Sequence, residues 1–186
     1  MDSRRLGPRV PDSRLVNVVV DTPAGSRNKF KFDEQLGLFR LHKRLPVGAG
    51  FPFDFGFVPG TRAADGDALD VLIVEGEPTF TGCLMTVRLL GVLESEQTDE
   101  KGRWIRNDRL IGAPETEKIQ PEARSLEDLP AGLLDQIEHF FTSYNRAEGR
   151  EFRVLARRGP QAASRRVDGS TERRKPARRG RKRPAK

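Results

Sequence analysis

Three aspartates fall within six residues in the segment Asp65-Gly66-Asp67-Ala68-Leu69-Asp70. Like charges this close repel one another unless a cation or a bound proton offsets them. Hard divalent cations prefer oxygen ligands, and Mg²⁺ usually takes one or two carboxylates together with water and substrate phosphate oxygens. The glycine lets the chain turn so that the carboxylates can converge. The segment therefore predicts a Mg²⁺ site, and the competing interpretation is an acidic turn that only contacts solvent.

Other polar groups follow the expected strands and add to this site. Asp99 lies in a second turn, and Asn107 and Asp108 follow the next short strand. Lys29 and Lys31 are two residues apart, so their side chains point to the same face of a strand. Further positive charge comes from Lys43, Arg44 and Arg109. A divalent cation and several basic side chains can together hold two linked phosphates, because the metal bridges phosphate oxygens and the side chains neutralise the remaining charge.

Short apolar segments separated by turn residues must position these groups. We expect strands at residues 15–20, 29–32, 37–41, 69–74, 85–93, 104–105 and 151–155, from their β-branched and apolar content. The aromatic segment 51–60 is expected to be strand-like, because its Pro and Gly residues would break a helix.

One helix is clear from its periodicity. Apolar residues at 133, 134, 137, 140, 141 and 144 form a single stripe, and Ser125 with Asp128 can form a capping arrangement just before it. Several short strands followed by one helix favour a mainly β fold of the α+β class. We expect a five-stranded β-barrel with helices packed outside it.

Charge divides the chain into two parts. Residues 157–186 contain 13 Lys or Arg and 2 acidic residues, so the formal net charge of +7 leaves residues 1–156 at about −4. The folded body is therefore a poor nucleic-acid binder, whereas the basic tail could bind DNA or RNA. We predict a flexible segment at 1–14, one domain at 15–156, and a disordered basic tail at 157–186, where little apolar content is available for burial.

The expected cellular location and the absence of a disulfide follow from features that the sequence lacks. No stretch is apolar and long enough to span a bilayer, and residues 1–10 lack the apolar segment of a secretory signal. A single cysteine, Cys83, excludes an internal disulfide. We therefore expect a cytoplasmic protein that does not engage a membrane.

Segments in the right order over about 140 residues resemble the soluble, family I inorganic pyrophosphatases. The most specific is Asp-Gly-Asp-Ala-Leu-Asp-Val-Leu at 65–72. Supporting matches are Val-Val-Val-Asp-Thr-Pro-Ala at 18–24, Asn-Lys-Phe at 28–30, Phe-Pro-Phe-Asp-Phe-Gly-Phe at 51–57, Gly-Val-Leu at 91–93 and Gln-Ile-Glu-His-Phe-Phe-Thr-Ser-Tyr at 136–144. The resemblance implies an OB-like five-stranded barrel, Mg²⁺ as cofactor, and hydrolysis of pyrophosphate to two phosphates by a metal-activated water. It also implies a homo-oligomer.

The resemblance also implies roles for individual residues. By position, Asp67 would accept the proton of the attacking water. Metal ligands would be Asp65, Asp70 and Asp99; phosphate contacts would be Lys29, Lys43, Arg109 and Tyr144; and Asp21 would be an outer-shell acid.

Several positions depart from the family pattern, and two of these departures add positive charge. Lys31 stands where the family has a glutamate, and Asn107 stands at the place of an aspartate ligand. Because the segment between Asp99 and Pro114 is longer than in the family, Asp108 is an alternative ligand to Asn107. Other departures are Phe51, Phe55 and Phe57 for tyrosines, Lys43 for an arginine, Arg109 for a lysine, and Asn145 for a basic residue. Such a site should need fewer metal ions to hold pyrophosphate, or should bind it poorly when Mg²⁺ is scarce.

Two other functions stay open at the level of the sequence. A paralogue could use the same metal chemistry on another phosphate ester or a nucleotide, with Lys31 and the phenylalanines reshaping the pocket. A non-catalytic OB-like protein could bind nucleic acid through its tail, with Phe51, Phe53, Phe55 and Phe57 stacking on bases. The acidic body and the alternation of these phenylalanines, which is more typical of a core strand, argue against the second function.

Overall fold

A closed ring of five strands forms the centre of the molecule. The computed structural model describes residues 6–74, 76–116 and 122–171. Strand β1 pairs with β4 and β6, β4 with β5, β5 with β8, and β8 with β6, which closes the ring. Only the pairing of β5 with β8 is parallel among these five. The expected five-stranded OB-like barrel with flanking helices is therefore confirmed.

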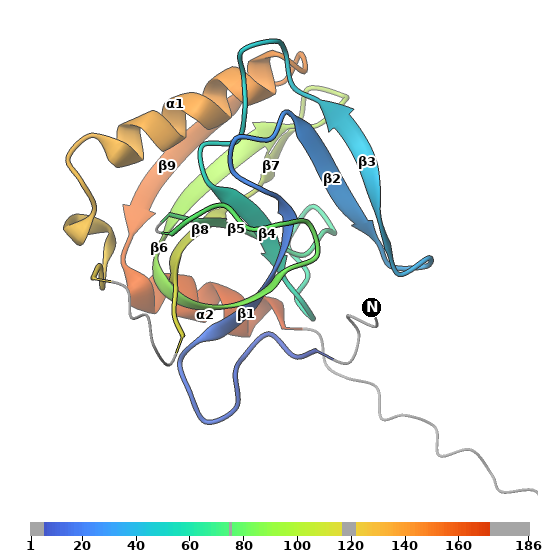
Figure 1. The fold of residues 1–186 in the computed structure, drawn as a ribbon. Coiled ribbons are helices and arrows are strands. Elements are labelled where there is room, and N and C mark those ends of the chain that lie inside the picture. The colour runs from blue at the N-terminus through green and yellow to red at the C-terminus, as the bar shows by residue number, and fades with distance from the viewer. Residues whose placement is uncertain (1–5, 75, 117–121, 172–186) are drawn as a thin grey trace, which may run out of the picture.

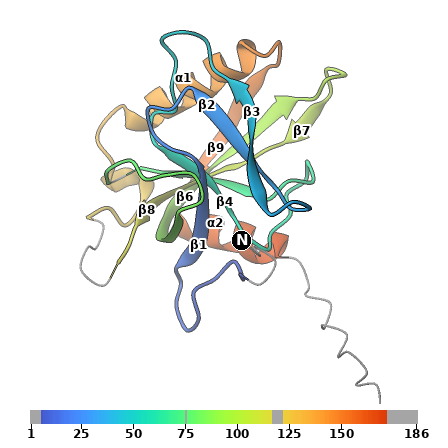
Figure 2. The same ribbon diagram turned by 45° about the vertical axis from the view of Figure 1, so that its right-hand side comes forward.

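The remaining strands extend or flank this barrel. The long strand β6 continues past the ring and pairs with β7 and β9, while β2 and β3 form a separate hairpin beside the barrel (Figures 1 and 2). The strands are β1 (Val16–Thr22), β2 (Asn28–Asp33), β3 (Leu38–Arg44), β4 (Asp54–Val58), β5 (Leu69–Ile73), β6 (Leu84–Thr98), β7 (Trp104–Arg106), β8 (Arg109–Pro114) and β9 (Phe152–Arg158). The helices are the 3₁₀ helix η2 (Leu126–Asp128), α1 (Leu133–Arg146) and α2 (Pro160–Ser170).

Two helices cover two different parts of the core. Successive residues of a strand point to opposite faces, so Val71 of β5 packs in the cluster that contains Val167 of α2, whereas Leu72 packs in the cluster that contains Phe141 of α1. In Figure 1, α1 lies along one side of the barrel with β9, and α2 lies at its lower end. The apolar stripe predicted for α1 is confirmed, with Ile137 and Phe141 fully buried.

One glycine is required where two strands approach closely. Gly56 of β4 pairs with Val20 of β1, and a Cβ atom at residue 56 would lie 2.3 Å from the carbonyl oxygen of Val19. No side chain fits at that distance. The glycine of the aromatic segment therefore keeps β1 and β4 in contact.

The predicted limits of the ordered chain need correction at both ends. The prediction that disorder begins at residue 157 is wrong, because β9 continues to Arg158 and α2 follows it, with Ala163 and Val167 of α2 fully buried. Residues 172–186 of the predicted tail lie outside the described residues. Near the N-terminus, where we expected a flexible segment, the Arg9 guanidinium donates to the Asp168 carboxylate at 2.7 Å and to Ser164. Residues 1–5 also lie outside the described residues.

Membrane insertion through a helix finds no support in the part of the chain that the structure describes. Neither α1 nor α2 is long and apolar enough to cross a bilayer.

Candidate phosphate and metal site

The acidic segment forms a hydrogen-bonded loop between β4 and β5. Asp65 and Asp67 lie in this loop and Asp70 lies on β5. Gly66 adopts φ 91°, a left-handed conformation that favours glycine. The backbone N–H of Asp67 donates to the Asp65 carboxylate at 3.1 Å, and the carbonyl of Asp67 accepts from Ala63 at 2.7 Å. These hydrogen bonds therefore fix the conformation of the loop that carries Asp65 and Asp67, just before β5.

The β2–β3 hairpin brings a lysine to this loop. The ammonium of Lys31 donates to both carboxylate oxygens of Asp67, at 2.9 and 2.8 Å. The two side chains are 53% and 57% exposed. Exposed ion pairs contribute little to folding stability. The main effect of this contact is therefore to neutralise the negative charge of Asp67 in the loop.

A buried arginine neutralises the next carboxylate. The parallel pairing of β5 and β8 sets Asp70 directly beside Arg109, and the Arg109 guanidinium donates to the carboxylate of Asp70 and to the side-chain oxygen of Asn107. Only 6% of the Arg109 side chain is exposed. Its guanidinium carbon lies 5.2 Å from the ring centre of Phe141, so α1 forms the back of this position.

Aromatic rings hold two further cations between the hairpin and α1. The ammonium of Lys29 lies 4.4 Å from the ring centre of Phe55 and 5.7 Å from that of Tyr144. Lys43, which pairs with Lys29 across the hairpin, lies 4.6 Å from the Tyr144 ring and forms an ion pair with Glu148. The ring contacts position both cations without cancelling their charge, whereas the ion pair with Glu148 partly offsets the charge of Lys43.

The local electrostatics connect these groups into one site. Burial raises the pKa of Asp21 to about 7, with Lys29 opposing the change and the Asp70 carboxylate adding to it. One carboxylate oxygen of Asp21 is buried with no hydrogen-bond partner. Asp65 is exposed as a residue, but its carboxyl is crowded by protein atoms, and this partial desolvation followed by the charges of Asp70 and Asp67 raises its pKa.

Tyr144 and Lys43 belong to the same electrostatic environment. Burial raises the pKa of the Tyr144 phenol, with smaller effects from Glu148, Arg109 and Asp70, so the hydroxyl stays protonated and can donate to an anion. Burial also lowers the pKa of Lys43, which the ion pair with Glu148 opposes.

Two of the candidate residues lie in other hydrogen-bond networks. The Asp99 carboxylate accepts from the backbone of Lys101 and Arg103 and pairs with the Arg103 guanidinium at 2.7 Å. Asp108 accepts from Arg106 at 2.5 Å and from Arg166 at 2.8 Å. In the described chain, neither carboxylate contacts the acidic loop, and Asn107 rather than Asp108 is the residue beside Arg109 and Asp70.

Two residues of the site were missed from the sequence. Glu148 pairs with Lys43 and lies in the turn just after α1, where no sequence pattern indicated it. Gln97, at the end of β6, accepts from Arg109 at 3.5 Å, and no sequence pattern indicated it.

The phenylalanines considered for base stacking pack within the protein, including Phe53, which is partly buried against the core cluster that contains Phe51 and Phe55. Phe51 and Phe55 are each 1% exposed and pack against each other with ring centres 5.2 Å apart. Phe57 stacks on Phe32 within the protein, at 5.9 Å. The structure therefore contradicts the alternative in which these rings form a nucleic-acid platform.

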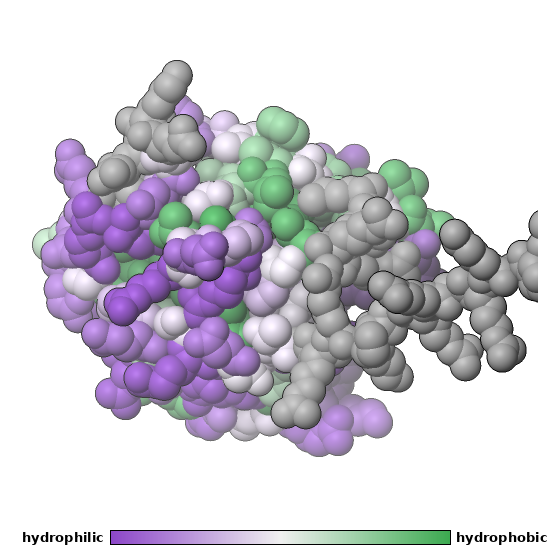
Figure 3. All heavy atoms as spheres, turned by 90° about the horizontal axis from the view of Figure 1, so that it is seen from below, coloured by the Kyte–Doolittle hydropathy of each residue, from purple (hydrophilic) through white to green (hydrophobic). Residues whose placement is uncertain are grey.

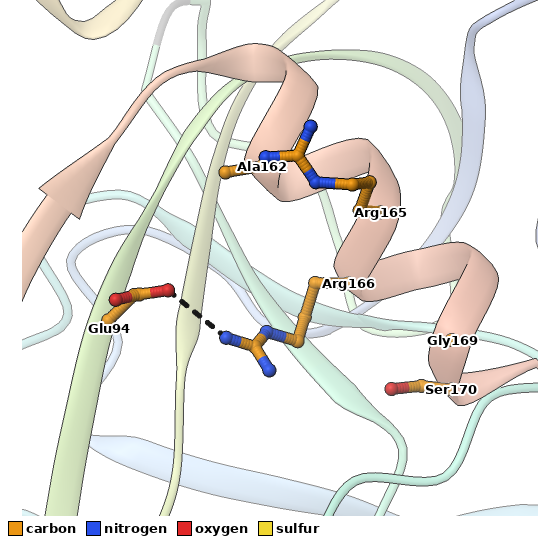
Figure 4. Close-up of a pocket in the computed structure, with 6 residues that line it drawn as sticks. All are labelled: Glu94, Ala162, Arg165, Arg166, Gly169 and Ser170. Atoms are coloured by element: carbon orange, nitrogen blue, oxygen red, sulfur yellow. Dashed lines mark hydrogen bonds and ion pairs between the residues drawn. The ribbon is translucent and has the colours of Figure 1, made fainter.

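A separate pocket of about 330 Å³ lies beside α2 and shares no residue with the acidic loop (Figure 4). The Arg166 guanidinium donates to Glu94 at 3.2 Å there, and it also pairs with Asp108. Arg166 thereby fastens α2 to β6. Much of the face seen in Figure 3 is hydrophilic.

The carboxylate oxygens of the acidic segment suit a divalent cation that is also coordinated by the substrate. Among the residues with described positions, no group of three or more His, Cys, Asp or Glu forms a ready metal cage. Mg²⁺ does not require one, because it commonly uses one or two carboxylates and completes its shell with water and phosphate oxygens. Asp65 and Asp70 supply such a pair, since the Asp70 carboxylate is near enough to raise the pKa of Asp65.

Carboxylates that can bind a divalent cation lie beside lysines and an arginine on an OB-like barrel. This combination defines a class of enzymes that act on phosphate compounds. The family model described as inorganic pyrophosphatase matches residues 18–175. The inorganic pyrophosphatase of Geobacillus stearothermophilus is 34% identical over 157 residues, which cover 84% of this chain and 92% of that protein. That of Synechocystis sp. is 36% identical over 83% of this chain and 88% of that protein.

Solved structures agree with the sequence comparison. The crystal structure of the inorganic pyrophosphatase from Thermus thermophilus superimposes with a TM-score of 0.80 at 31% identity, over 91% of this chain and 97% of that one. The structure from Neisseria gonorrhoeae gives 0.81 at 30% identity, over 91% and 96%. The chain belongs to the inorganic pyrophosphatase family.

Proposed function

We propose that this protein hydrolyses inorganic pyrophosphate to two phosphates with Mg²⁺ as its cofactor. The observation that carries the proposal is the pairing of two carboxylates of the acidic segment with cations from other elements, Asp67 with Lys31 and Asp70 with Arg109. Pyrophosphate carries several negative charges on two linked groups, so it needs both kinds of partner. Family membership supports the same substrate.

The basic side chains bind and orient the two phosphates. Lys29 and Lys43 are held against aromatic rings, and each can donate to phosphate oxygens as a point charge, with Lys43 shared between the phosphate and Glu148. Arg109 is fixed by Asp70 and presents a planar fork. The protonated hydroxyl of Tyr144 adds a neutral donor. Together they hold the substrate in one orientation, which lowers the entropy cost of the reaction.

Asp67 serves as the proton acceptor. In hydrolysis, a water oxygen forms a bond to one phosphorus, the bridging P–O bond breaks, and the bridging oxygen leaves with its electron pair on the second phosphate. The proton of the attacking water passes to a carboxylate oxygen of Asp67. Both oxygens of Asp67 are oriented by Lys31, so the acceptor is held in position before substrate arrives.

Asp65 and Asp70 would hold the Mg²⁺, with Asn107 in place of a further carboxylate. The ion, when bound, lowers the pKa of a coordinated water and neutralises phosphate charge. Asp99 and Asp108 are not part of this proposed set, because in the described chain neither carboxylate contacts the acidic loop. Arg103 binds the first, and Arg106 and Arg166 bind the second. We further propose that the protein works in the cytoplasm as a homo-oligomer, in keeping with its family.

The test is phosphate release from pyrophosphate over a Mg²⁺ series. Wild-type activity should depend on Mg²⁺, and both Asp67→Asn and Asp70→Asn should lower kcat at least about a hundredfold, as expected for the loss of a proton acceptor or of a metal ligand. Glu34→Gln, an exposed carboxylate on the β2–β3 turn, is the matched control and should leave kcat unchanged. An inert wild type, or mutants as active as it, would refute the proposal.

A further inference from the structure

Two of the three carboxylates in the acidic segment already carry a side-chain cation. Lys31 lies on both oxygens of Asp67, and Arg109 lies on Asp70. These cations come from β2 and β8, two elements far from the loop in sequence. A divalent cation approaching the segment therefore meets one carboxylate without a described ion pair, Asp65, and one that is shared with Arg109.

The two cations differ in how firmly they are placed. Arg109 is almost fully buried and has Asn107, Gln97 and Phe141 as further partners, so its position is fixed. Lys31 is 53% exposed, and the described contacts of its ammonium are the two oxygens of Asp67. A lysine ammonium is a compact charge on a flexible stem with three donors. Lys31 can therefore keep one hydrogen bond to Asp67 while it donates another to an incoming anion.

Geometry and charge both associate Lys31 with Lys29, one of the residues proposed to bind the phosphates. Lys31 is two residues from Lys29 on the same strand face. The charges of both lysines lower the pKa of Asp21, and the charge of Asp70 raises it. An anion held by Lys29 is thus within the electrostatic reach of Lys31.

We propose that Lys31 is a resident cation of the site, which takes at Asp67 the place that a divalent ion would otherwise fill and then contacts the phosphate. The chain should consequently bind a pyrophosphate group with fewer divalent ions than a variant with a carboxylate at position 31. This inference rests on the proposed function, because it concerns the same substrate. It assigns Lys31 as a substrate-binding residue that sets the metal requirement.

The test counts metal ions rather than measuring turnover. Mn²⁺ binding is followed by electron paramagnetic resonance, which detects the free ion, with imidodiphosphate as a non-hydrolysable probe. Lys31→Glu, which adds a carboxylate beside Asp67, should bind one more Mn²⁺ per chain than the wild type. Lys31→Met should bind imidodiphosphate about tenfold more weakly at limiting Mn²⁺, as expected for the loss of one charge-assisted hydrogen bond.

Arg40→Met is the matched control for the loss of a cation. Arg40 lies opposite Lys31 in the hairpin and forms a comparable exposed ion pair with Asp33 at 3.0 Å, so it should alter neither the Mn²⁺ count nor the probe affinity. Thermal melts of all variants verify folding. If Lys31→Glu does not fold, the affinity of Lys31→Met for imidodiphosphate still tests the inference.

Equal Mn²⁺ counts in the wild type and Lys31→Glu, together with an unchanged affinity in Lys31→Met, would overturn the inference. An effect of Arg40→Met as large as that of Lys31→Met would also overturn it, because general electrostatics would then suffice. Failure of the proposed function is a distinct result: a wild type that binds the probe and Mn²⁺ as expected but releases no phosphate from pyrophosphate.

Discussion

Asp21 gives the sharpest link between this structure and pH. The side chain is buried, one carboxylate oxygen has no hydrogen-bond partner, and burial raises its pKa from the ordinary 3.8 to about 7. In the unfolded chain the same group loses its proton near its ordinary pKa. Between about pH 4 and pH 7 the folded state therefore holds a proton that the unfolded state has lost.

The sign and size of the effect follow from this difference. Because the folded state binds more protons in this range, the free energy of unfolding decreases as the pH rises, by about 1.4 kcal/mol per pH unit at most. Over the full interval the destabilisation reaches at most about 4 kcal/mol. Above pH 7 both states are charged and the contribution becomes constant. Asp21→Asn removes the titrating group and with it this slope.

The assay is urea unfolding of the wild type and Asp21→Asn from pH 5 to pH 8, followed by circular dichroism. EDTA is included, because a divalent ion near Asp70 would favour the charged form of Asp21. We expect the stability of Asp21→Asn relative to wild type to increase by about 3 kcal/mol between these pH values. Asp12→Asn, at an exposed position, should run parallel to wild type. Parallel curves for Asp21→Asn as well would refute the reasoning.

Three further predictions concern the site, the barrel and the tail. Arg109→Lys should lower kcat/KM about tenfold and the melting temperature as well, because a lysine cannot reproduce the planar fork on Asp70; unchanged kinetics would show that charge alone suffices. Gly56→Ala should destabilise the fold by about 2 kcal/mol or more in urea unfolding, since the new Cβ would lie 2.3 Å from the Val19 carbonyl oxygen, and a stable variant would contradict the close approach of β1 and β4. Deleting 172–186 should abolish low-salt binding to DNA in a fluorescence-anisotropy titration while pyrophosphate hydrolysis persists, and DNA binding that survives the deletion would exclude the tail as the binding segment.

Strong local patterns made much of the fold predictable. The apolar stripe of α1 and the Val-rich β1 were recognised because their periodicity is unambiguous. Strand β8 was missed, because Arg109–Pro114 contains a glycine, an alanine and a proline and is held by its neighbours β5 and β6. Helix α2 was missed because it buries only the small residues Ala163 and Val167 in a basic sequence.

The residues of the site could be predicted from the sequence, but the ion pairs and hydrogen bonds between them could not. The Asp-rich segment identified the loop, and the resemblance assigned most of its partners. No local pattern could show that Lys31 reaches Asp67, because the hairpin and the loop meet only through the folded barrel. The same reason applies to Asn107 and Asp108, whose side chains separate into two clusters only when β8 is placed between β5 and β6.

The end of α2 is hydrogen-bonded to the base of the acidic loop. The N–H of Arg62 donates to the Ser170 carbonyl at 2.7 Å, and Thr171 forms a β-bridge with Thr61. Thr61 in turn accepts from Leu69 where β5 begins. During synthesis on the ribosome, the loop is made early but these contacts appear only after residue 171 has emerged. The nascent chain should therefore complete the base of the acidic loop only after α2 has been made, later than the strands of the barrel.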